Sequence, residues 1–140
     1  MTRPLHEQRR SPSAELMGST FVSYDAEAGV VTFEYTPPPS FASPRGVVQG
    51  GLIGGFLDEV MGAALLAHTQ GESLPLNLDL AMTFIRPVPL ATIRATGRVI
   101  QAGRRAVFLE GELHDMAGQV LARATSTAIP TAVPATPGQA

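Results

Sequence analysis

The segment from Gly46 to His68 constrains the fold of this chain more than any other part of the sequence. It is apolar enough to form a buried helix, yet it carries two adjacent carboxylates, Asp58 and Glu59, near its middle. A helix that is apolar on nearly every face is normally enclosed by other structure, and an ionised carboxylate is costly to bury without partners. Because such departures from local rules concentrate at functional sites, the segment predicts both a core helix and a functional site.

Glycines surround Asp58 on the predicted helix. Residues three and four positions apart share a helix face. Three of the four neighbours of Asp58 at these spacings are glycines, each about 1 kcal/mol less favourable than alanine in a helix interior. This bare surface predicts that a second backbone, or a ligand, approaches the carboxylate closely. The four neighbours are Gly54, Gly55, Met61 and Gly62.

The start of the same helix supplies a second chemical group. Gln49-Gly50-Gly51 opens it, and unpaired N–H groups and the positive end of the helix dipole collect at a helix start. An acyl-transfer site needs donors for a developing oxyanion and a base or nucleophile beneath the carbonyl. The helix therefore offers both groups, with Asp58 about two turns after the donors.

Two simpler interpretations compete with a functional site. A membrane span is disfavoured because the uninterrupted apolar runs are short and two acids lie centrally, and the Gly51/Gly55 pair is a weak helix-dimer motif without a long apolar segment. A purely structural interpretation places Asp58 and Glu59 at an exposed turn and gives the glycines packing roles. Glu59 taken alone is better explained as a paired structural or interface acid than as a catalytic one.

Composition narrows the class of protein. At 140 residues the chain is large enough for one domain with a real core, and its net charge of −2 argues against a nucleic-acid binder. The absence of Cys excludes disulfides, thiol nucleophiles and Cys-based zinc sites, and the three His residues are too scattered for a metal site. We therefore expect no metal and no cofactor. All ten basic residues are Arg, which suits bidentate contact with phosphate.

The two ends of the chain differ from its middle. Residues 1–13 are polar and Arg-rich and residues 130–140 are rich in Pro, Ala and Thr, so we expect two disordered tails around a folded domain of residues 14–129. The N-terminus carries charge but no apolar signal region, so a cytoplasmic location without membrane contact is expected by default.

Strand patterns flank the helix. Residues 16–24 and 30–35 are β-prone and are joined by a turn at 25–29, and a proline-rich loop at 36–44 leads to the helix. After the helix, alternating segments at 76–85, 91–99, 105–114 and 119–129 predict a meander of four strands. Two strands, one long helix and four strands indicate an α+β layer, with a mainly antiparallel sheet of five to six strands rolled around the helix.

Particular residues in this order resemble a known family. A Gly-Gly pair, here after Gln49, precedes a carboxylate at Asp58, nine residues after Gln49, and Phe84-Ile85-Arg86-Pro87 ends a strand. Further matching pieces are Gly97-Arg98-Val99, Gly103-Arg104-Arg105, Phe108-Leu109-Glu110-Gly111-Glu112 and the run from Gly118 to Thr125. In order and spacing these pieces resemble the hotdog-fold acyl-CoA thioesterases of the phenylacetate-degradation type over about residues 14–129.

The resemblance implies roles for individual residues. The backbone N–H of Gly50 polarises the thioester carbonyl, and Asp58 of the opposite subunit acts as nucleophile or as general base on water. Ser43 stands where the family usually has Asn or Gln, Asn77 where it often has Ser or Thr, and Gln49 where it has His. The substrate contacts implied by the resemblance are those of Gln49, Gly51, Glu59, Arg86, Arg104 and Arg105.

Simpler interpretations stay open for several of these residues. Asn77 on the polar side of a strand is also explained as an ordinary solvent or interface residue, and Ser43 before Pro44 as the start of a turn. Arg104 and Arg105 at a hairpin are often plain solvated charges.

The resemblance implies a homodimer or dimer of dimers that hydrolyses an acyl-CoA to a carboxylate and free coenzyme A, the coenzyme being part of the substrate. The hotdog hydratases are a weaker match because they place a His five residues after the Asp, and position 63 here is Ala. A non-catalytic hotdog that only binds acyl-CoA is the third alternative. The sequence leaves the acyl group open.

Overall fold

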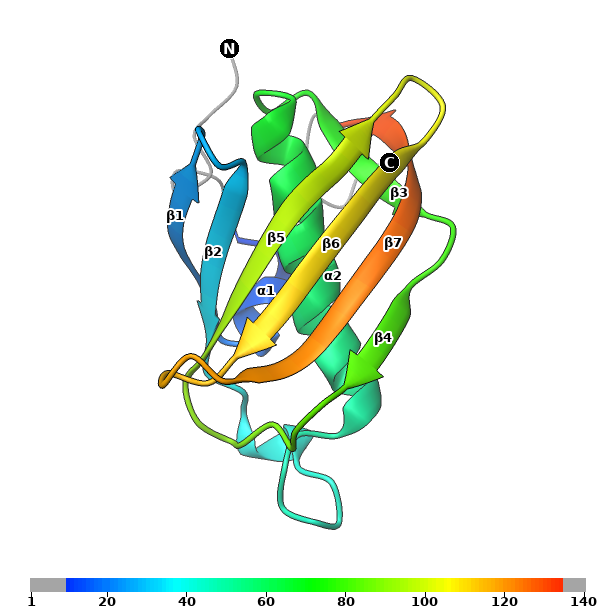
Figure 1. Ribbon diagram of the computed structural model, residues 1–140. Coiled ribbons are helices and arrows are strands. Elements are labelled where there is room, and N and C mark those ends of the chain that lie inside the picture. The colour runs from blue at the N-terminus through cyan, green and yellow to red at the C-terminus, as the bar shows by residue number, and fades with distance from the viewer. Residues whose placement is uncertain (1–9, 135–140) are drawn as a thin grey trace.

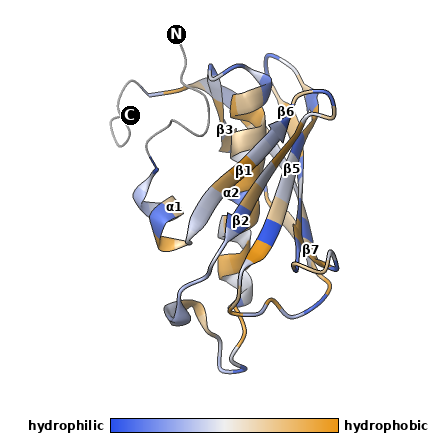
Figure 2. Cartoon of the chain, turned by 90° about the vertical axis from the view of Figure 1, so that its left-hand side faces the viewer, coloured by the Kyte–Doolittle hydropathy of each residue, from blue (hydrophilic) through white to orange (hydrophobic). Residues whose placement is uncertain are grey.

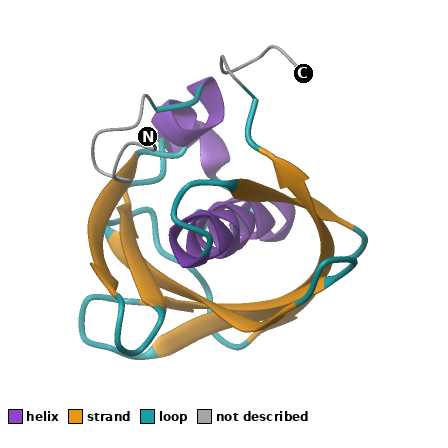
Figure 3. Ribbon diagram, turned by 90° about the horizontal axis from the view of Figure 1, so that it is seen from above, coloured by secondary structure: helices purple, strands orange, loops and turns teal. Residues whose placement is uncertain are grey.

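The computed structural model of the protein describes residues 10–134. One antiparallel sheet of seven strands, in the order β1-β2-β5-β6-β7-β3 with β4 also paired to β7, curls around a single long helix, α2 (Figures 1 and 3). The predicted α+β architecture of a hotdog fold is confirmed. The elements are α1 (Pro12–Leu16), β1 (Ser19–Asp25), β2 (Val30–Tyr35), the 3-10 turn η2 (Pro39–Phe41), α2 (Gly50–His68), β3 (Ser73–Asn77), β4 (Ala81–Phe84), β5 (Ile93–Ala102), β6 (Val107–His114) and β7 (Val120–Ala132).

Helix α2 begins and ends at recognisable caps. The side-chain oxygen of Gln49 accepts a hydrogen bond from the backbone N–H of Leu52 at 3.1 Å, which satisfies one of the donors that a helix start leaves open. At the other end, the N–H of Thr69 bonds to the carbonyl of Leu65, and Gly71, with φ of 87°, turns the chain toward β3. The predicted helix therefore spans almost the whole segment that the sequence marked.

The helix packs directly on the backbone of the sheet. A Cβ atom added at Gly97 of β5 would lie 2.4 Å from the carbonyl oxygen of Val60, and one added at Gly111 of β6 would lie 3.1 Å from the side chain of Met61. Both positions face the helix, but only the backbone contact at Gly97 requires glycine, because at Gly111 the Met61 side chain can shift. The buried residues of α2, among them Phe56 and Leu57, fill the space on either side of this contact.

The composition of α2 follows from this position. It is the one helix among residues 10–134 that is long and apolar enough to cross a membrane by length and composition, with a mean hydropathy of 1.4. Hydrophobic residues occur along its turns (Figure 2), and the sheet covers much of it. A core helix wrapped by a sheet needs the same composition, because it has apolar neighbours on several sides.

The predicted strand at 76–85 was wrong as a single element. It divides into β3 and β4, which brings the sheet to seven strands instead of five to six. The backbone N–H groups of Leu78 and Asp79 both point to the carbonyl of Thr127, and the Asp79 carboxylate accepts from the N–H of Thr127 at 2.8 Å. These contacts fold the link between β3 and β4 onto β7, so the alternation read from the sequence does not continue through it.

Smaller differences occur at the ends of the domain. Leu16 belongs to α1 and not to the first strand, and β7 continues to Ala132, beyond the expected boundary at 129. The proline-rich loop contains the short turn η2. The expected tails lie partly outside the described residues, at 1–9 and 135–140.

Candidate active site

The carboxylate of Asp58 meets Asn77 at the end of β3. The side-chain nitrogen of Asn77 donates a hydrogen bond to Oδ1 of Asp58, and both side chains are exposed. Since a carboxylate only accepts hydrogen bonds, the amide must turn its nitrogen toward it. One oxygen of Asp58 is thus occupied, and no hydrogen bond within the described chain is made to Oδ2.

The glycines beside Asp58 are covered by the same chain. The Met82 sulfur lies 3.3 Å from where a Cβ of Gly54 would be, and the Pro75 ring lies 3.7 Å from the corresponding position at Gly62. On the other side, Met17 lies 3.0 Å from the Cβ position of Gly55. The expectation of a bare surface open to a second backbone is therefore corrected, because β3 and β4 occupy much of it and bring Asn77 to Asp58.

A further residue supports Asn77. Ser126 of β7 is 3% exposed, and its hydroxyl lies 3.2 Å from Oδ1 of Asn77 and 2.8 Å from the backbone oxygen of Asp79. The sequence pattern does not predict a role for Ser126. The only sequence feature that could have indicated Ser126 is its hydroxyl, which stands among the small inward-facing residues of β7, between Ala124 and Ala128.

Glu59 points to a different side of the helix from Asp58. Its Oε1 accepts hydrogen bonds from the Tyr35 hydroxyl at 2.8 Å and from the Ser19 hydroxyl at 2.5 Å, and the Tyr35 hydroxyl also lies 3.1 Å from the carbonyl of Phe56. Burial, and then the charge of Glu59, raises the pKa of Tyr35 well above its ordinary value. Glu59 thus joins α2 to β1 and β2, and its geometry is that of a paired structural acid.

The helix start presents free donors. No hydrogen bond within the described chain is made by the N–H groups of Gly50 and Gly51, while the Gln49 side chain is used as the cap. The Phe84 ring lies 3.6 Å from the Cβ position of Gly50 and covers it on one side. Gly50 and Asp58 are eight residues apart, which is about 12 Å along the helix axis. One subunit therefore cannot present both groups to one carbonyl.

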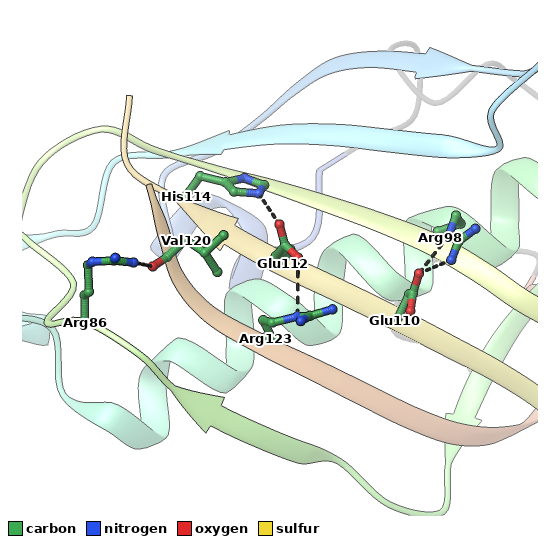
Figure 4. Close-up of polar contacts among 7 residues, drawn as sticks. All are labelled: Arg86, Arg98, Glu110, Glu112, His114, Val120 and Arg123. Atoms are coloured by element: carbon green, nitrogen blue, oxygen red, sulfur yellow. Dashed lines mark hydrogen bonds and ion pairs between the residues drawn. The ribbon is translucent and has the colours of Figure 1, made fainter. Parts of the chain in front are cut away.

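The other predicted residues are scattered around this helix. The Ser43 hydroxyl accepts from the N–H of Arg45 at 3.3 Å and so starts a turn. Arg86 donates to the carbonyl of Val120 at 2.6 Å (Figure 4). Arg104 and Arg105 are exposed on the turn between β5 and β6, at the end of the molecule away from the start of α2 (Figure 1), and make no ion pair with the described residues.

Two arginines of β5, the strand that leads into that turn, already have acidic partners. Arg94 pairs with Glu34 at 2.5 Å, and Arg98 pairs with Glu110 on the sheet face turned away from α2 (Figure 4). Among residues 10–134 no three His, Asp or Glu side chains cluster as metal ligands would.

Known proteins resemble this chain in sequence and in architecture. The profile of the thioesterase superfamily matches residues 45–122, which is more than half of the chain. The chain belongs to the thioesterase superfamily. The match includes Gln49, Asp58, Asn77 and the Arg104-Arg105 turn but ends before Ser126.

Solved structures agree with the assignment. A phenylacetic acid degradation-related protein of Ralstonia eutropha is 30% identical, with a TM-score of 0.79 over 87% of this chain and 92% of its own. Conserved protein PA5202 of Pseudomonas aeruginosa is 27% identical, with a TM-score of 0.80 over 91% and 100% of the two chains. A Streptococcus mutans protein bound to acetyl CoA shares the fold at 21% identity, with a TM-score of 0.74 over 93% and 98%. No curated protein is significantly similar in sequence. The protein is a thioester hydrolase of the phenylacetate-degradation type.

The raised pKa of Tyr35 predicts that this thioesterase loses stability at alkaline pH. Because its pKa is raised in the folded state, the folded protein binds the phenol proton more tightly than the unfolded chain does. The stability that this group contributes is complete below the unfolded pKa of about 10 and is lost as the pH rises toward the folded pKa. We expect the free energy of unfolding, measured by urea titration, to fall above about pH 10. The Tyr35→Phe variant should have a lower free energy of unfolding at pH 8, and this free energy should change less with pH than that of the wild type.

The chain suits this measurement because it has no Lys and no Cys and only two Tyr. In Tyr24→Phe, the matched control, Tyr35 is the only tyrosine, and tyrosinate absorbance should rise only as the protein unfolds. A rise at the ordinary tyrosine pKa in protein that is still folded would contradict the role of Tyr35.

Proposed function

We propose that this thioesterase hydrolyses acyl-CoA thioesters to a carboxylate and free coenzyme A. The observation that carries the proposal is Asp58, an exposed carboxylate on the core helix with Oδ1 held by Asn77 and Oδ2 open to a ligand. The Streptococcus mutans neighbour with bound acetyl CoA supports a coenzyme A thioester as the substrate.

Two routes use these groups. As a nucleophile, Asp58 Oδ2 attacks the thioester carbon, the C–S bond breaks, coenzyme A leaves as the thiolate, and water then hydrolyses the mixed anhydride. As a general base, Asp58 takes a proton from a water that attacks the same carbon, and coenzyme A leaves in one displacement. In both routes negative charge develops on the carbonyl oxygen, and the N–H of Gly50 stabilises it.

A second subunit completes this site. Because Gly50 and Asp58 of one chain lie about 12 Å apart along α2, the Gly50 donor near one Asp58 comes from a partner. The sheet ends at β3 and β4 in an edge with one unpaired side, and this edge carries large exposed apolar side chains. We expect a symmetric dimer across it, with two dimers forming a tetramer. The apolar side chains are Leu76, Leu78, Leu80, Phe84 and Ile85.

Asp58→Asn tests the chemistry. We expect kcat to fall by at least about a hundredfold because the variant loses its base or nucleophile while Asn77 keeps a polar partner. Turnover is followed by released thiol over a panel of acyl-CoA substrates, and the mass and circular dichroism should match wild type. Wild-type turnover in Asp58→Asn together with complete loss in Glu59→Gln would mean that the two acids have the opposite roles. Binding of acyl-CoA without turnover in the wild-type protein would identify a binding module.

Leu78→Glu tests the dimer. Leu78 is 62% exposed at the free edge, and a buried charge there should separate the subunits and remove activity while each subunit stays folded. Leu16→Glu is the matched control, since Leu16 is 59% exposed on α1, away from this edge. Light scattering at micromolar concentration gives the mass. A wild-type monomer that keeps full activity would refute both the dimer and the shared site.

Arg104 and Arg105 are proposed to bind the phosphates of coenzyme A. Guanidinium groups bind phosphate through paired hydrogen bonds, and exposed pairs of charges weaken with salt. Arg104→Ala with Arg105→Ala should raise KM for acyl-CoA, most strongly at low ionic strength, with kcat nearly unchanged. Arg94→Ala with Arg98→Ala is the control, because these two arginines already have acidic partners. Equal losses on a truncated thioester without the nucleotide would mean that Arg104 and Arg105 only stabilise the hairpin.

A further inference from the structure

Two buried serines contact the two adjacent carboxylates of α2, one directly and one through Asn77. Among the described residues, Ser19 and Ser126 are buried serines, and the hydroxyl of the buried Tyr35 also bonds to Glu59. Ser19 bonds directly to Glu59, whereas Ser126 bonds to Asn77, which in turn bonds to Asp58. A buried hydroxyl is costly unless it has partners, and the partners of Ser126 all belong to the segment that carries Asn77.

The single hydroxyl proton of Ser126 is shared between two acceptors of the segment that carries Asn77. Its hydroxyl lies 2.8 Å from the carbonyl of Asp79 and 3.2 Å from Oδ1 of Asn77. The carbonyl end is itself rigid, because the Asp79 carboxylate accepts from the N–H of Thr127 on the same strand. The amide oxygen of Asn77 is therefore held against β7 while its nitrogen reaches Asp58.

Asn77 needs such a support because of its own side chain. An Asn amide rotates broadly about its second side-chain torsion, which moves both its oxygen and its nitrogen, whereas rotation of a Ser or Thr hydroxyl moves only the hydrogen. An amide held at its oxygen by Ser126 and at its nitrogen by Asp58 cannot rotate without losing both contacts. One carboxylate oxygen of Asp58 is then always occupied, and the other stays open.

We propose that Ser126 is a positioning residue, which acts through Asn77 to keep Oδ1 of Asp58 occupied and to present Oδ2 to the substrate or to water. The inference rests on the proposed hydrolysis for its kinetic consequence but not for the contact itself. Ser126 lies beyond residues 45–122, the part that the thioesterase profile matches.

The contact can be observed without any activity, because Asn77 is the only Asn in the chain. Protein labelled with [15N]asparagine gives one side-chain amide signal, and its heteronuclear NOE reports how rigid the amide is. We expect a rigid amide in wild type and a mobile one in Ser126→Ala, with Asp58 and the backbone fold retained. Thr125→Ala, on the outward side of the same strand, is the matched control and should leave the amide rigid. An amide equally rigid in Ser126→Ala would overturn the proposal.

A double-mutant cycle tests the kinetic consequence. A typical hydrogen bond contributes enough that Ser126→Ala should lower kcat about three- to tenfold with KM unchanged. In the Asn77→Ala background the same change should have no further effect on kcat, because the amide through which Ser126 acts is already absent. Equal losses in both backgrounds would mean that Ser126 only supports the fold. If Ser126→Ala does not fold, Ser126→Cys keeps the volume and weakens the donor, and the same comparison applies. Absence of turnover in wild type would refute the hydrolysis, while the amide signal would still decide the role of Ser126.

Discussion

The contact between the helix backbone and the sheet backbone fixes how closely α2 approaches the sheet, and the position of both acids depends on it. At Gly97 the sheet comes so close to the carbonyl of Val60 that a single added carbon would overlap it. The depth of α2 in the sheet is thus fixed by backbone atoms. Its rotation is fixed by side chains on either flank, with Glu59 bonded to β1 and β2 and Asp58 bonded to β3.

Two identical charges in succession acquire different properties from this arrangement. Neighbouring residues of a helix point about 100° apart, so Asp58 and Glu59 cannot meet the same surroundings. Glu59 turns toward buried hydroxyls, where Tyr35 and Ser19 use one of its oxygens. Asp58 turns toward the sheet edge, where a single amide holds it and solvent reaches it. One acid bonded to buried hydroxyls and one acid open to solvent therefore follow from the rotation of one helix.

The sequence predicts the parts of this structure that depend on local pattern. The long helix and its start at Gly50 follow from composition and spacing, and most strands follow from alternation. The split between β3 and β4 could not be predicted, because it depends on hydrogen bonds from Leu78 and Asp79 to Thr127, which lies far away in the sequence. Ser126 was missed for the same reason, since its partner Asn77 lies 49 residues earlier. The sequence shows the glycines beside Asp58, but it does not predict that other segments of the same chain pack against them.

The sheet edge joins the chemistry of the site to the assembly of the protein. The link that folds onto β7 brings Asn77 to Asp58, and the same link turns Leu78 and its apolar neighbours outward. Apolar side chains on an unpaired edge favour association. In the proposed dimer, that association also brings a second Gly50 near Asp58. The link between β3 and β4 thus brings Asn77 to Asp58 and also forms the surface of the proposed dimer, so a change that straightened this link would remove both.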